Sequence, residues 1–392
     1  MTKLEQLIKE LCPNGVEYKT LGEIAVDVFR GAGIKRDEVT AEGIPCVRYG
    51  EIYTTYGVWF DECVSHTQLE NVPTPKYFEH GDILFAITGE SVEDIAKSTA
   101  YVGHDKCLAG GDIVVLKHNQ NPKYLAYALS TTDAQMQKSK GKVKSKVVHS
   151  SVPAIKEIVV PIPPLPVQSE IVRILDNFAE LSAELSAELS ARKKQYEYYR
   201  DALYTIDDAE IEWKTLNQIS VNCDRQRKPV TKGNRVAGKY PYYGASGIVD
   251  YVEDYIFDGD FLLVSEDGAN LLARSTPIAF SISGKNWVNN HAHVLKFDTY
   301  ELRRYVEIYL NSIDLSKYIS GGAQPKLNQE NLNKIPIPLP SFKRVKFVVD
   351  ILDRFDTLCN DISEGLPAEI EGRRKQYEYY RDKLLTFKEL TT

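Results

Sequence analysis

The side chains best suited to chemistry in this sequence are basic, and one group of them forms a short alternating run. Five lysines alternate with small residues, at Lys138, Lys140, Lys142, Lys144 and Lys146. This alternation fits a flexible loop or an edge strand that lays ammonium groups along a phosphate backbone. A solvated lysine edge that blocks sheet aggregation is the alternative. The run therefore predicts a nucleic-acid contact and leaves the solvated edge open.

A second basic segment opens the second half of the chain. It contains Arg225, Arg227, Lys228, Lys232, Arg235 and Lys239. Arginine suits the edge of guanine because its planar fork donates two hydrogen bonds. An ordinary surface charge run is the alternative. Seven further candidates rest only on charge or aromatic type: Arg30, Lys35, Arg36, Arg48, Tyr49, Arg274 and Lys285.

The loop 320–328 corresponds in position to the lysine run of the first half. Its glycines allow close approach of the backbone, and Gln324, Lys326 and Asn328 can address base edges or phosphates. A polar turn without a ligand is the alternative. The loop completes the set of predicted DNA contacts.

No catalytic or metal-binding signature is present. The phosphate-binding pattern G-x-x-x-x-G-K-S/T is missing, and Gly31-Ala32-Gly33 lacks the third glycine of a dinucleotide fingerprint. His291-Ala292-His293 has no cysteine or carboxylate at ligand spacing, so a structural or polar contact is favoured over a metal. Asn121-Pro122-Lys123-Tyr124 is interpreted as a helix start. We expect no catalytic residue, no metal and no cofactor in this chain.

Composition places these segments in a globular protein of two or three domains. The chain has 392 residues, of which 43% are hydrophobic and 26% charged. The net charge of −7 argues against binding nucleic acid by bulk electrostatics, so any contact must come from local patches. The sequence has no apolar run long enough to span a membrane and no signal peptide. We expect a cytoplasmic protein with six reduced, mostly buried cysteines.

An internal repeat organises the chain. Lys194–Asp201 recurs without change as Lys375–Asp382, and Ile174-Leu175-Asp176 recurs as Ile351-Leu352-Asp353. The offset between the copies is 177 at the Ile-Leu-Asp motif and 181 at the eight-residue block, which predicts a four-residue insertion between them in the second copy, near Gly365 to Gly372. Because four residues are close to one helical turn, we expect the second helix to carry the insertion.

The repeat positions two long helices, each behind a proline-rich breaker. Apolar and aromatic residues at spacings of three and four predict amphipathic helices that pair in an antiparallel, coiled-coil-like manner. The residues expected at the interface between the helices or with a partner are Phe178, Leu181, Leu185, Tyr196, Tyr199, Phe355, Leu358, Tyr377 and Tyr380. For the tyrosines, packing within the chain is the alternative to contact with another subunit.

The globular parts are predicted to be β-rich, because short β-branched runs such as 112–117 and 259–264 are bounded by Gly and Asp. One helix per copy is expected, near 124–129 and near 305–310. The predicted fold is therefore α+β with a pseudo-twofold internal repeat, in which two long helices separate two globular domains. The expected boundaries are 1–166 and 208–340 for the domains, and 167–207 and 341–392 for the helices.

The repeated K-Q-Y-E-Y-Y-R-D block, the proline-rich 161–166 and the two Ile-Leu-Asp motifs resemble the specificity subunit of type I restriction-modification systems, over the whole chain. The resemblance implies a non-catalytic DNA reader whose two target-recognition domains each read one half of a bipartite target. It also implies two methyltransferase subunits that carry S-adenosylmethionine, and restriction and translocation subunits that use ATP and Mg²⁺.

Two other functions remain open. A self-contained adenine methyltransferase would bind S-adenosylmethionine alone, although the cofactor loop is missing. A scaffold would join two protein-binding lobes without DNA. The charge adds one expectation to the favoured function: residues 1–166 hold 21 acidic and 18 basic side chains and residues 207–340 hold 17 and 15, so the isolated chain should bind DNA weakly.

Overall fold

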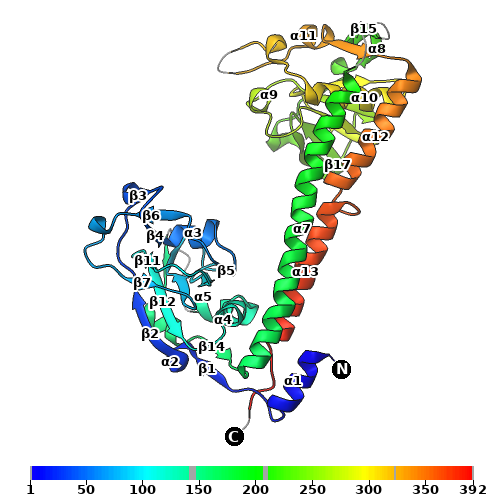
Figure 1. The fold of residues 1–392 in the computed structure, drawn as a ribbon. Coiled ribbons are helices and arrows are strands. Elements are labelled where there is room, and N and C mark those ends of the chain that lie inside the picture. Colours follow the sequence, from blue (N-terminus) through cyan, green and yellow to red (C-terminus); the bar gives the residue numbers. More distant parts are fainter. Residues whose placement is uncertain (1, 141–146, 206–210, 322–323, 391–392) are drawn as a thin grey trace. The chain divides into compact units, whose positions relative to one another are not determined.

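The computed structural model describes residues 2–140, 147–205, 211–321 and 324–390. The chain forms two compact units (Figure 1). Unit 1 comprises Met1–Ser186 and Ile370–Thr392, and unit 2 comprises Ala187–Glu369. The long helix α7 (Leu165–Tyr204) contributes residues to both units.

Unit 1 is built on two five-stranded sheets and short flanking pairs. The first sheet has the order β2 (Ala25–Arg30), β12 (Ile113–His118), β8 (Ile83–Ala86), β10 (Ser98–Tyr101) and β5 (Trp59–Phe60). The second has the order β3 (Val39–Thr40), β6 (Ser65–Thr67), β4 (Ile44–Val47), β11 (Cys107–Ala109) and β7 (Tyr77–Phe78). The two-stranded pairs are β1 (Tyr18–Thr20) with β14 (Val159–Pro161), and β9 (Thr88–Gly89) with β13 (Val148–His149).

The helices of unit 1 are α1 (Lys3–Leu11), α2 (Leu21–Ile24), α3 (Tyr49–Thr54), α4 (Pro122–Leu129), α5 (Thr132–Ser139) and α6 (Val152–Lys156), with the first part of α7. α4 and α7 pack on one face of the first sheet, whereas Ile52 of α3 lies in the core on the other face. Alternate residues of β8 enter two different cores, Phe85 the core with α4 and α7, and Leu84 the core between the sheets. This explains why the strand is apolar at every position. The predicted helix start at Asn121 is confirmed, because its Oδ1 accepts from the backbone N–H of Tyr124 (3.1 Å).

Unit 2 repeats this arrangement with smaller sheets. One has the order β16 (Val221–Asn222), β23 (Ala292–Lys296), β20 (Phe261–Ser265) and β21 (Ala279–Ile282). The other has the order β18 (Gly247–Val252), β17 (Ala237–Gly244), β22 (Lys285–Val288) and β19 (Phe257–Asp258). A pair is formed by β15 (Glu212–Thr215) and β24 (Pro336–Leu339), and the helices are α8 (Leu216–Ile219), α9 (Asn270–Ala273), α10 (Tyr300–Ser312), α11 (Gln329–Asn333) and α12 (Phe342–Asn360).

The internal repeat is confirmed at the level of strand register. Tyr18 pairs with Pro161 in unit 1, and Trp213 pairs with Pro338 in unit 2. The carbonyl of Pro161 accepts a 2.9 Å hydrogen bond from the hydroxyl of Tyr124, and that of Pro338 accepts one of the same length from Tyr305. The two proline-rich segments therefore anchor equivalent helices, as the α+β repeat predicts.

The second long helix differs from the expectation, because it is interrupted. α12 ends at Asn360 and α13 (Leu366–Leu384) begins after a turn. The carboxylate of Asp361 accepts from the backbone N–H groups of Ser363 (2.7 Å) and Glu364 (3.2 Å), a local arrangement that competes with helical hydrogen bonds. The expectation of one uninterrupted helix over 341–392 is therefore wrong.

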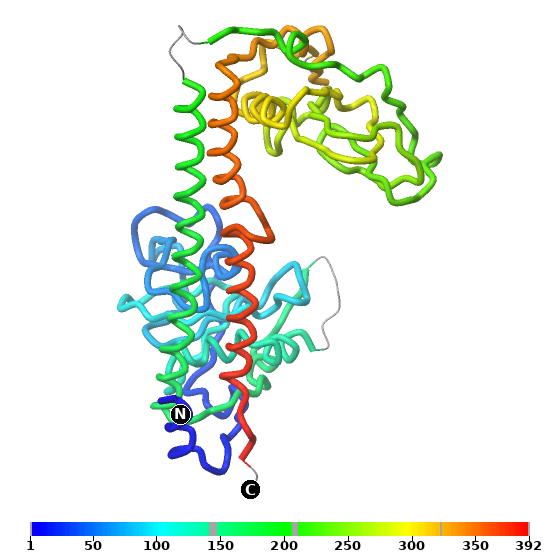
Figure 2. Tube along the Cα trace, turned by 90° about the vertical axis from the view of Figure 1, so that its right-hand side faces the viewer, coloured from blue at the N-terminus to red at the C-terminus, as the bar shows by residue number. Residues whose placement is uncertain are grey.

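Each unit pairs α7 with part of the second helix. In unit 1, α7 and α13 lie side by side in both ribbon views, and Phe178 stacks on Tyr380 with ring centroids 5.7 Å apart (Figures 1 and 2). In unit 2, Tyr199 lies 5.6 Å from Phe355. Leu181 and Leu358 are exposed in this chain. The helix residues thus combine internal packing with apolar surface that is open to a partner.

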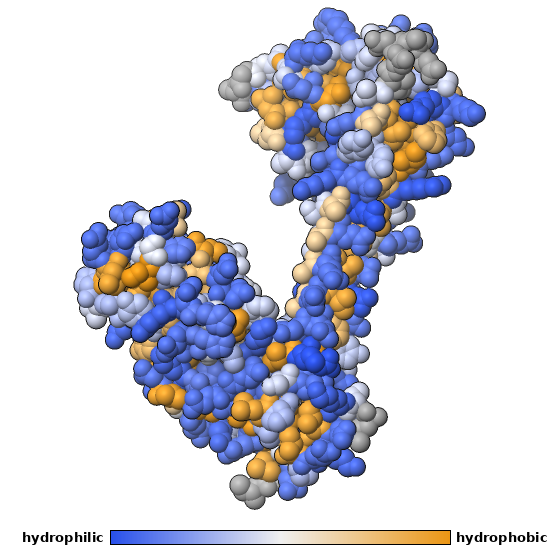
Figure 3. Space-filling model, viewed as in Figure 1, coloured by the Kyte–Doolittle hydropathy of each residue, from blue (hydrophilic) through white to orange (hydrophobic). Residues whose placement is uncertain are grey.

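The surface is mainly hydrophilic, with small apolar patches on the visible face of each unit (Figure 3). No helix of the described residues is long and apolar enough to cross a membrane. Five of the six cysteines are buried as free thiols, and Cys63 is half-buried.

Candidate DNA interface

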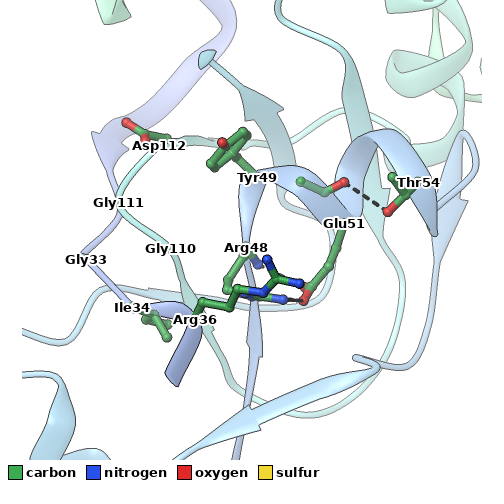
Figure 4. Close-up of a pocket in the computed structure, with 11 residues that line it drawn as sticks. Gly33, Ile34, Arg36, Arg48, Tyr49, Glu51, Thr54, Gly110, Gly111 and Asp112 are labelled. Atoms are coloured by element: carbon green, nitrogen blue, oxygen red, sulfur yellow. Dashed lines mark hydrogen bonds and ion pairs between the residues drawn. The ribbon is translucent and has the colours of Figure 1, made fainter. Parts of the chain in front are cut away.

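In unit 1, polar residues gather where the parallel strands β4 and β11 end (Figure 4). The carbonyl of Val47, the last residue of β4, accepts a 2.8 Å hydrogen bond from the backbone N–H of Gly110, directly after β11. A cavity of about 510 Å³ opens beside this junction. Its lining comes from three segments: Gly33, Ile34 and Arg36; Arg48, Tyr49, Gly50, Glu51 and Thr54; and Gly110, Gly111 and Asp112.

Glycines bring these segments together. A Cβ on Gly31 would lie 2.2 Å from the carbonyl oxygen of Gly110, so no larger residue fits at this crossing. The neighbouring Ala32 donates its N–H to the carbonyl of Ala109 (2.9 Å). Gly33 lines the cavity, and Gly31, two residues earlier, allows the close approach of the backbone at residues 109–110.

Two arginines reach this cavity from different segments. The Nε and Nη2 atoms of Arg48 each lie 3.2 Å from Oε1 of Glu51, a buried carboxylate that also accepts from the hydroxyl of Ser65 (2.7 Å). Arg48 is thus held in one orientation. Arg36 extends toward Arg48 in Figure 4, and it has no ion-pair partner among the described residues.

Tyr49 lies between this cavity and a second hollow. It is 39% exposed and lines both spaces. The second hollow, of about 610 Å³, extends past Tyr53 and Gly89 to Val147.

Unit 2 has the same junction with different side chains. The parallel strands β17 and β22 pair Tyr243 with Val288, and the N–H of Asn289 donates to the carbonyl of Tyr243 (3.1 Å), as Gly110 does to Val47. The turn Gly244–Gly247 takes the place of the start of α3. The backbone of the site is therefore duplicated, whereas its chemistry is not.

Some basic side chains of the segment 225–239 are exposed to solvent, and others form ion pairs within unit 2. Arg225 and Lys228 are exposed. Arg227 binds Glu266 (2.6 Å) and the carbonyl of Ala292 (2.7 Å), and it is largely buried. A structural role therefore replaces the predicted DNA contact at Arg227.

Arg235 is also held within unit 2. It pairs with Asp250 (3.1 Å), donates to the carbonyl of Val230 (3.0 Å) and covers the ring of Tyr242 at 4.4 Å. The structure thus gives Arg235 a structural role at the edge of this sheet.

Behind the unit 2 junction lies a buried charged cluster. The Nδ1 atom of His293 is 2.6 Å from the carboxylate of Asp224, and its Nε2 is 2.7 Å from the carbonyl of Leu327. Burial alone would raise the pKa of Asp224, but His293, the backbone N–H of Val294 and Arg227 together lower it. The preferred interpretation of the two histidines as polar contacts is confirmed, since His291 also binds Asp267 (2.9 Å).

The predicted DNA contacts in the loop 320–328 and in the lysine run differ in their exposure and in their partners. Lys326 is half-exposed and pairs with Glu266 (3.0 Å), Gln324 is exposed, and Asn328 caps α11 through its side chain. Lys140 is exposed, whereas Lys142, Lys144 and Lys146 lie outside the described residues.

The structure contradicts the predicted contact at Lys138. Lys138 lies in α5 and is buried, with Nζ donating to the carbonyl of Leu129 (2.7 Å) and to the hydroxyl of Ser98 (3.1 Å), so it cannot meet a DNA phosphate in this arrangement. Arg274 is half-buried and donates to the carbonyl of Ile313 (2.9 Å) beyond the end of α10, and its contact with DNA stays a prediction.

Sequence reasoning missed Glu51, Gly110 and Asn289. A polar or glycine residue directly after a buried strand was the available signal, but the parallel pairing that joins the strand ends has no local signature. Within the described ranges, no three His, Cys, Asp or Glu residues gather as a metal-binding group would.

A duplicated α+β fold, with the same strand-end junction in each copy, defines a protein built from two related domains. Residues 13–192 and 210–372 match the family model of the type I restriction modification DNA specificity domain. The chain therefore belongs to this family of type I restriction-modification specificity proteins. It is a DNA-recognition chain and has no catalytic role of its own.

The relatives agree with this assignment. The EcoR124I/EcoR124II specificity subunit of Escherichia coli is 34% identical over 290 residues, which cover 68% of this chain and 70% of that protein. A Haemophilus influenzae protein assigned as a type I restriction enzyme specificity subunit is 37% identical over 189 residues, or 47% of this chain and about half (49%) of that protein.

The fold also matches a solved structure. The type I restriction-modification S subunit from M. genitalium has a TM-score of 0.54 at 15% identity, covering 95% of this chain and 96% of that one. At this identity the match supports the fold alone.

Proposed function

We propose that the chain reads a bipartite DNA target, with residues 1–166 recognising one half and residues 208–340 the other. The observation that carries this proposal is the duplicated strand-end junction: Val47–Gly110 in unit 1 and Tyr243–Asn289 in unit 2 share one backbone hydrogen bond. Around this common frame, arginines and glycines line unit 1, and asparagine and a tight turn replace them in unit 2. A shared frame with different side chains suits two readers of different sequences.

The long helices are proposed to bind the partner subunits. Leu181 and Leu358 expose apolar surface on α7 and α12, beside tyrosines that pack only in part. Two methyltransferase subunits would dock there and carry S-adenosylmethionine. The restriction and translocation subunits would supply the ATP- and Mg²⁺-dependent steps.

The test is co-expression of this chain with its neighbouring methyltransferase gene in a host free of adenine methylation, followed by genome-wide mapping of modified adenines. We expect one motif of two short halves with a constant spacer. As a matched control, a chimera carrying residues 208–340 of a related specificity subunit should change one half only.

Two results would count against the proposal. A stable complex that modifies no motif would favour the protein-binding scaffold. Methylation by this chain alone would favour a self-contained methyltransferase.

A further inference from the structure

The unit 1 cavity combines a fixed cation with an unpaired one. The Arg48 guanidinium is oriented by buried Glu51, and Arg36 approaches it without an ion-pair partner among the described residues (Figure 4). Since Oε1 of Glu51 engages only Nε and Nη2, the Nη1 group of Arg48 is left to donate elsewhere. The cavity therefore presents hydrogen-bond donors at defined positions.

The ion pairs of the lining fix one cation and leave another unpaired. Glu51 pairs with Arg48 and Asp112 pairs with Arg30, whereas Arg36 has no ion-pair partner among the described residues. A guanidinium that is oriented by a buried carboxylate suits the directional acceptors of a base edge, because contacts to phosphates need no such fixed geometry.

The buried carboxylate of the lining is already occupied. Oε1 of Glu51 accepts from Arg48 and Ser65, and its Oε2 accepts from the backbone N–H of Arg48. An amino donor, which adenine and cytosine present in the major groove, would therefore find no free oxygen on Glu51. Guanine presents two adjacent acceptors, N7 and O6, which match an arginine fork.

We propose that unit 1 reads a guanine in its half of the DNA target, with Arg36 and Arg48 as the donors and Glu51 as the positioning residue of Arg48. This inference rests on the proposed function, because it assigns one base to the half-site of unit 1. Tyr49, at the rim, would contact the neighbouring base or sugar.

The first test maps methylation by complexes that contain Arg36→Ala or Arg48→Lys, in the co-expression system described above. Arg48→Lys keeps the charge beside Glu51 but loses the planar fork. Lys9→Ala, on the exposed face of α1, is the matched control. The unit 1 half is the one that the 208–340 chimera leaves unchanged.

We expect both variants to lose the requirement for guanine at one position of that half, where the preference for guanine over the other bases should fall about 5- to 150-fold. Lys9→Ala should keep the full motif. A bipartite wild-type motif with no guanine in either strand of the unit 1 half would overturn the guanine assignment and leave the proposed function standing. Unchanged motifs in both variants would overturn it as well.

A second measurement needs no variant, so it tests the proposal even if the variants fail to assemble with the partner subunits. The wild-type complex is titrated with target duplexes in which 7-deazaguanine, which lacks the N7 acceptor, replaces each guanine of the unit 1 half in turn. A loss of about 5-fold or more in affinity at one position supports the proposal, and equal affinity at every position contradicts it.

Discussion

Lys138 shows at the scale of one residue how burial changes the meaning of a charge. The lysine run predicts a phosphate contact, but sequence gives the type of a side chain and not its exposure. Because α5 extends to Ser139, Lys138 points into the core and binds the carbonyl of Leu129. Arg225 and Arg227 are the same residue type, but Arg225 is exposed whereas Arg227 binds Glu266 and the carbonyl of Ala292. Only the fold reveals this difference in exposure.

Lys138 leads to a prediction on stability and pH. Burial lowers its pKa to about 7, whereas an unfolded lysine titrates near pH 10.4. Between these values the unfolded chain binds more protons than the folded chain, so this lysine makes the folded state more stable as pH rises, by up to about 1.4 kcal/mol per pH unit. Lys138→Met should abolish this rise. Urea unfolding at pH 7, 8 and 9 measures the difference from wild type.

The exposed Lys140 provides the control for this experiment, because Lys140→Met should follow the wild-type pH dependence. A constant free-energy difference between wild type and Lys138→Met over this range would contradict the prediction.

At the scale of elements, the aspartate of the repeated Ile-Leu-Asp motif connects two helices in each unit. Asp176 on α7 accepts from the hydroxyl of Tyr127 (2.7 Å) and from Nζ of Lys123 (2.9 Å), both on α4. Asp353 on α12 accepts from the hydroxyl of Tyr300 (2.6 Å) and from Nε of Arg304 (2.7 Å), both on α10. In each unit the aspartate joins the long helix to the helix of the globular domain.

Replacing this aspartate should therefore weaken the unit without altering which bases it reads. We expect Asp353→Asn to lower the free energy of unfolding by about 1–3 kcal/mol, because the hydrogen bonds to a charged group are lost or weakened. Asp350→Asn, one turn earlier on the exposed face of α12, is the control. Urea unfolding measures both, and equal effects of the two changes would show that the contact with α10 contributes nothing.

The helices also show which features the internal repeat could predict and which it could not. The repeat predicted both helices and the inserted residues, because identical ends require the same packing. It missed the break after Asn360, since four residues fit one helical turn as well as they fit a turn between helices. Gly365 marks the break in hindsight, because a Cβ there would lie 2.4 Å from the carbonyl oxygen of Thr357.

At the scale of the whole molecule, the repeated segments made the fold predictable from sequence, whereas the candidate site could not be predicted because its side chains differ between the two copies. The repeated Lys194–Asp201 and Ile-Leu-Asp segments identify the two copies from sequence alone, and the structure places Tyr18 and Trp213 in matching register. The side chains around the two strand-end junctions differ, so a comparison of the two halves of the sequence reveals no shared pattern there. Only the fold brings Arg36, Arg48 and Gly110 together.

The charge of the whole chain sets its affinity for DNA. A net charge of −7 offers little release of counterions, and the cations of the candidate interfaces are partly neutralised by Glu51, Glu266 and Asp250. We expect the isolated chain to bind its target duplex at physiological salt with a Kd of about 10⁻⁶ to 10⁻⁴ M, as non-specific binders do. The methyltransferase subunits should tighten binding at least ~100-fold by enclosing the duplex, since specific complexes are typically tighter by 10³ or more. Fluorescence anisotropy with target and scrambled duplexes, with and without those subunits, measures both values, and nanomolar, sequence-specific binding by the chain alone would show that its own surfaces suffice.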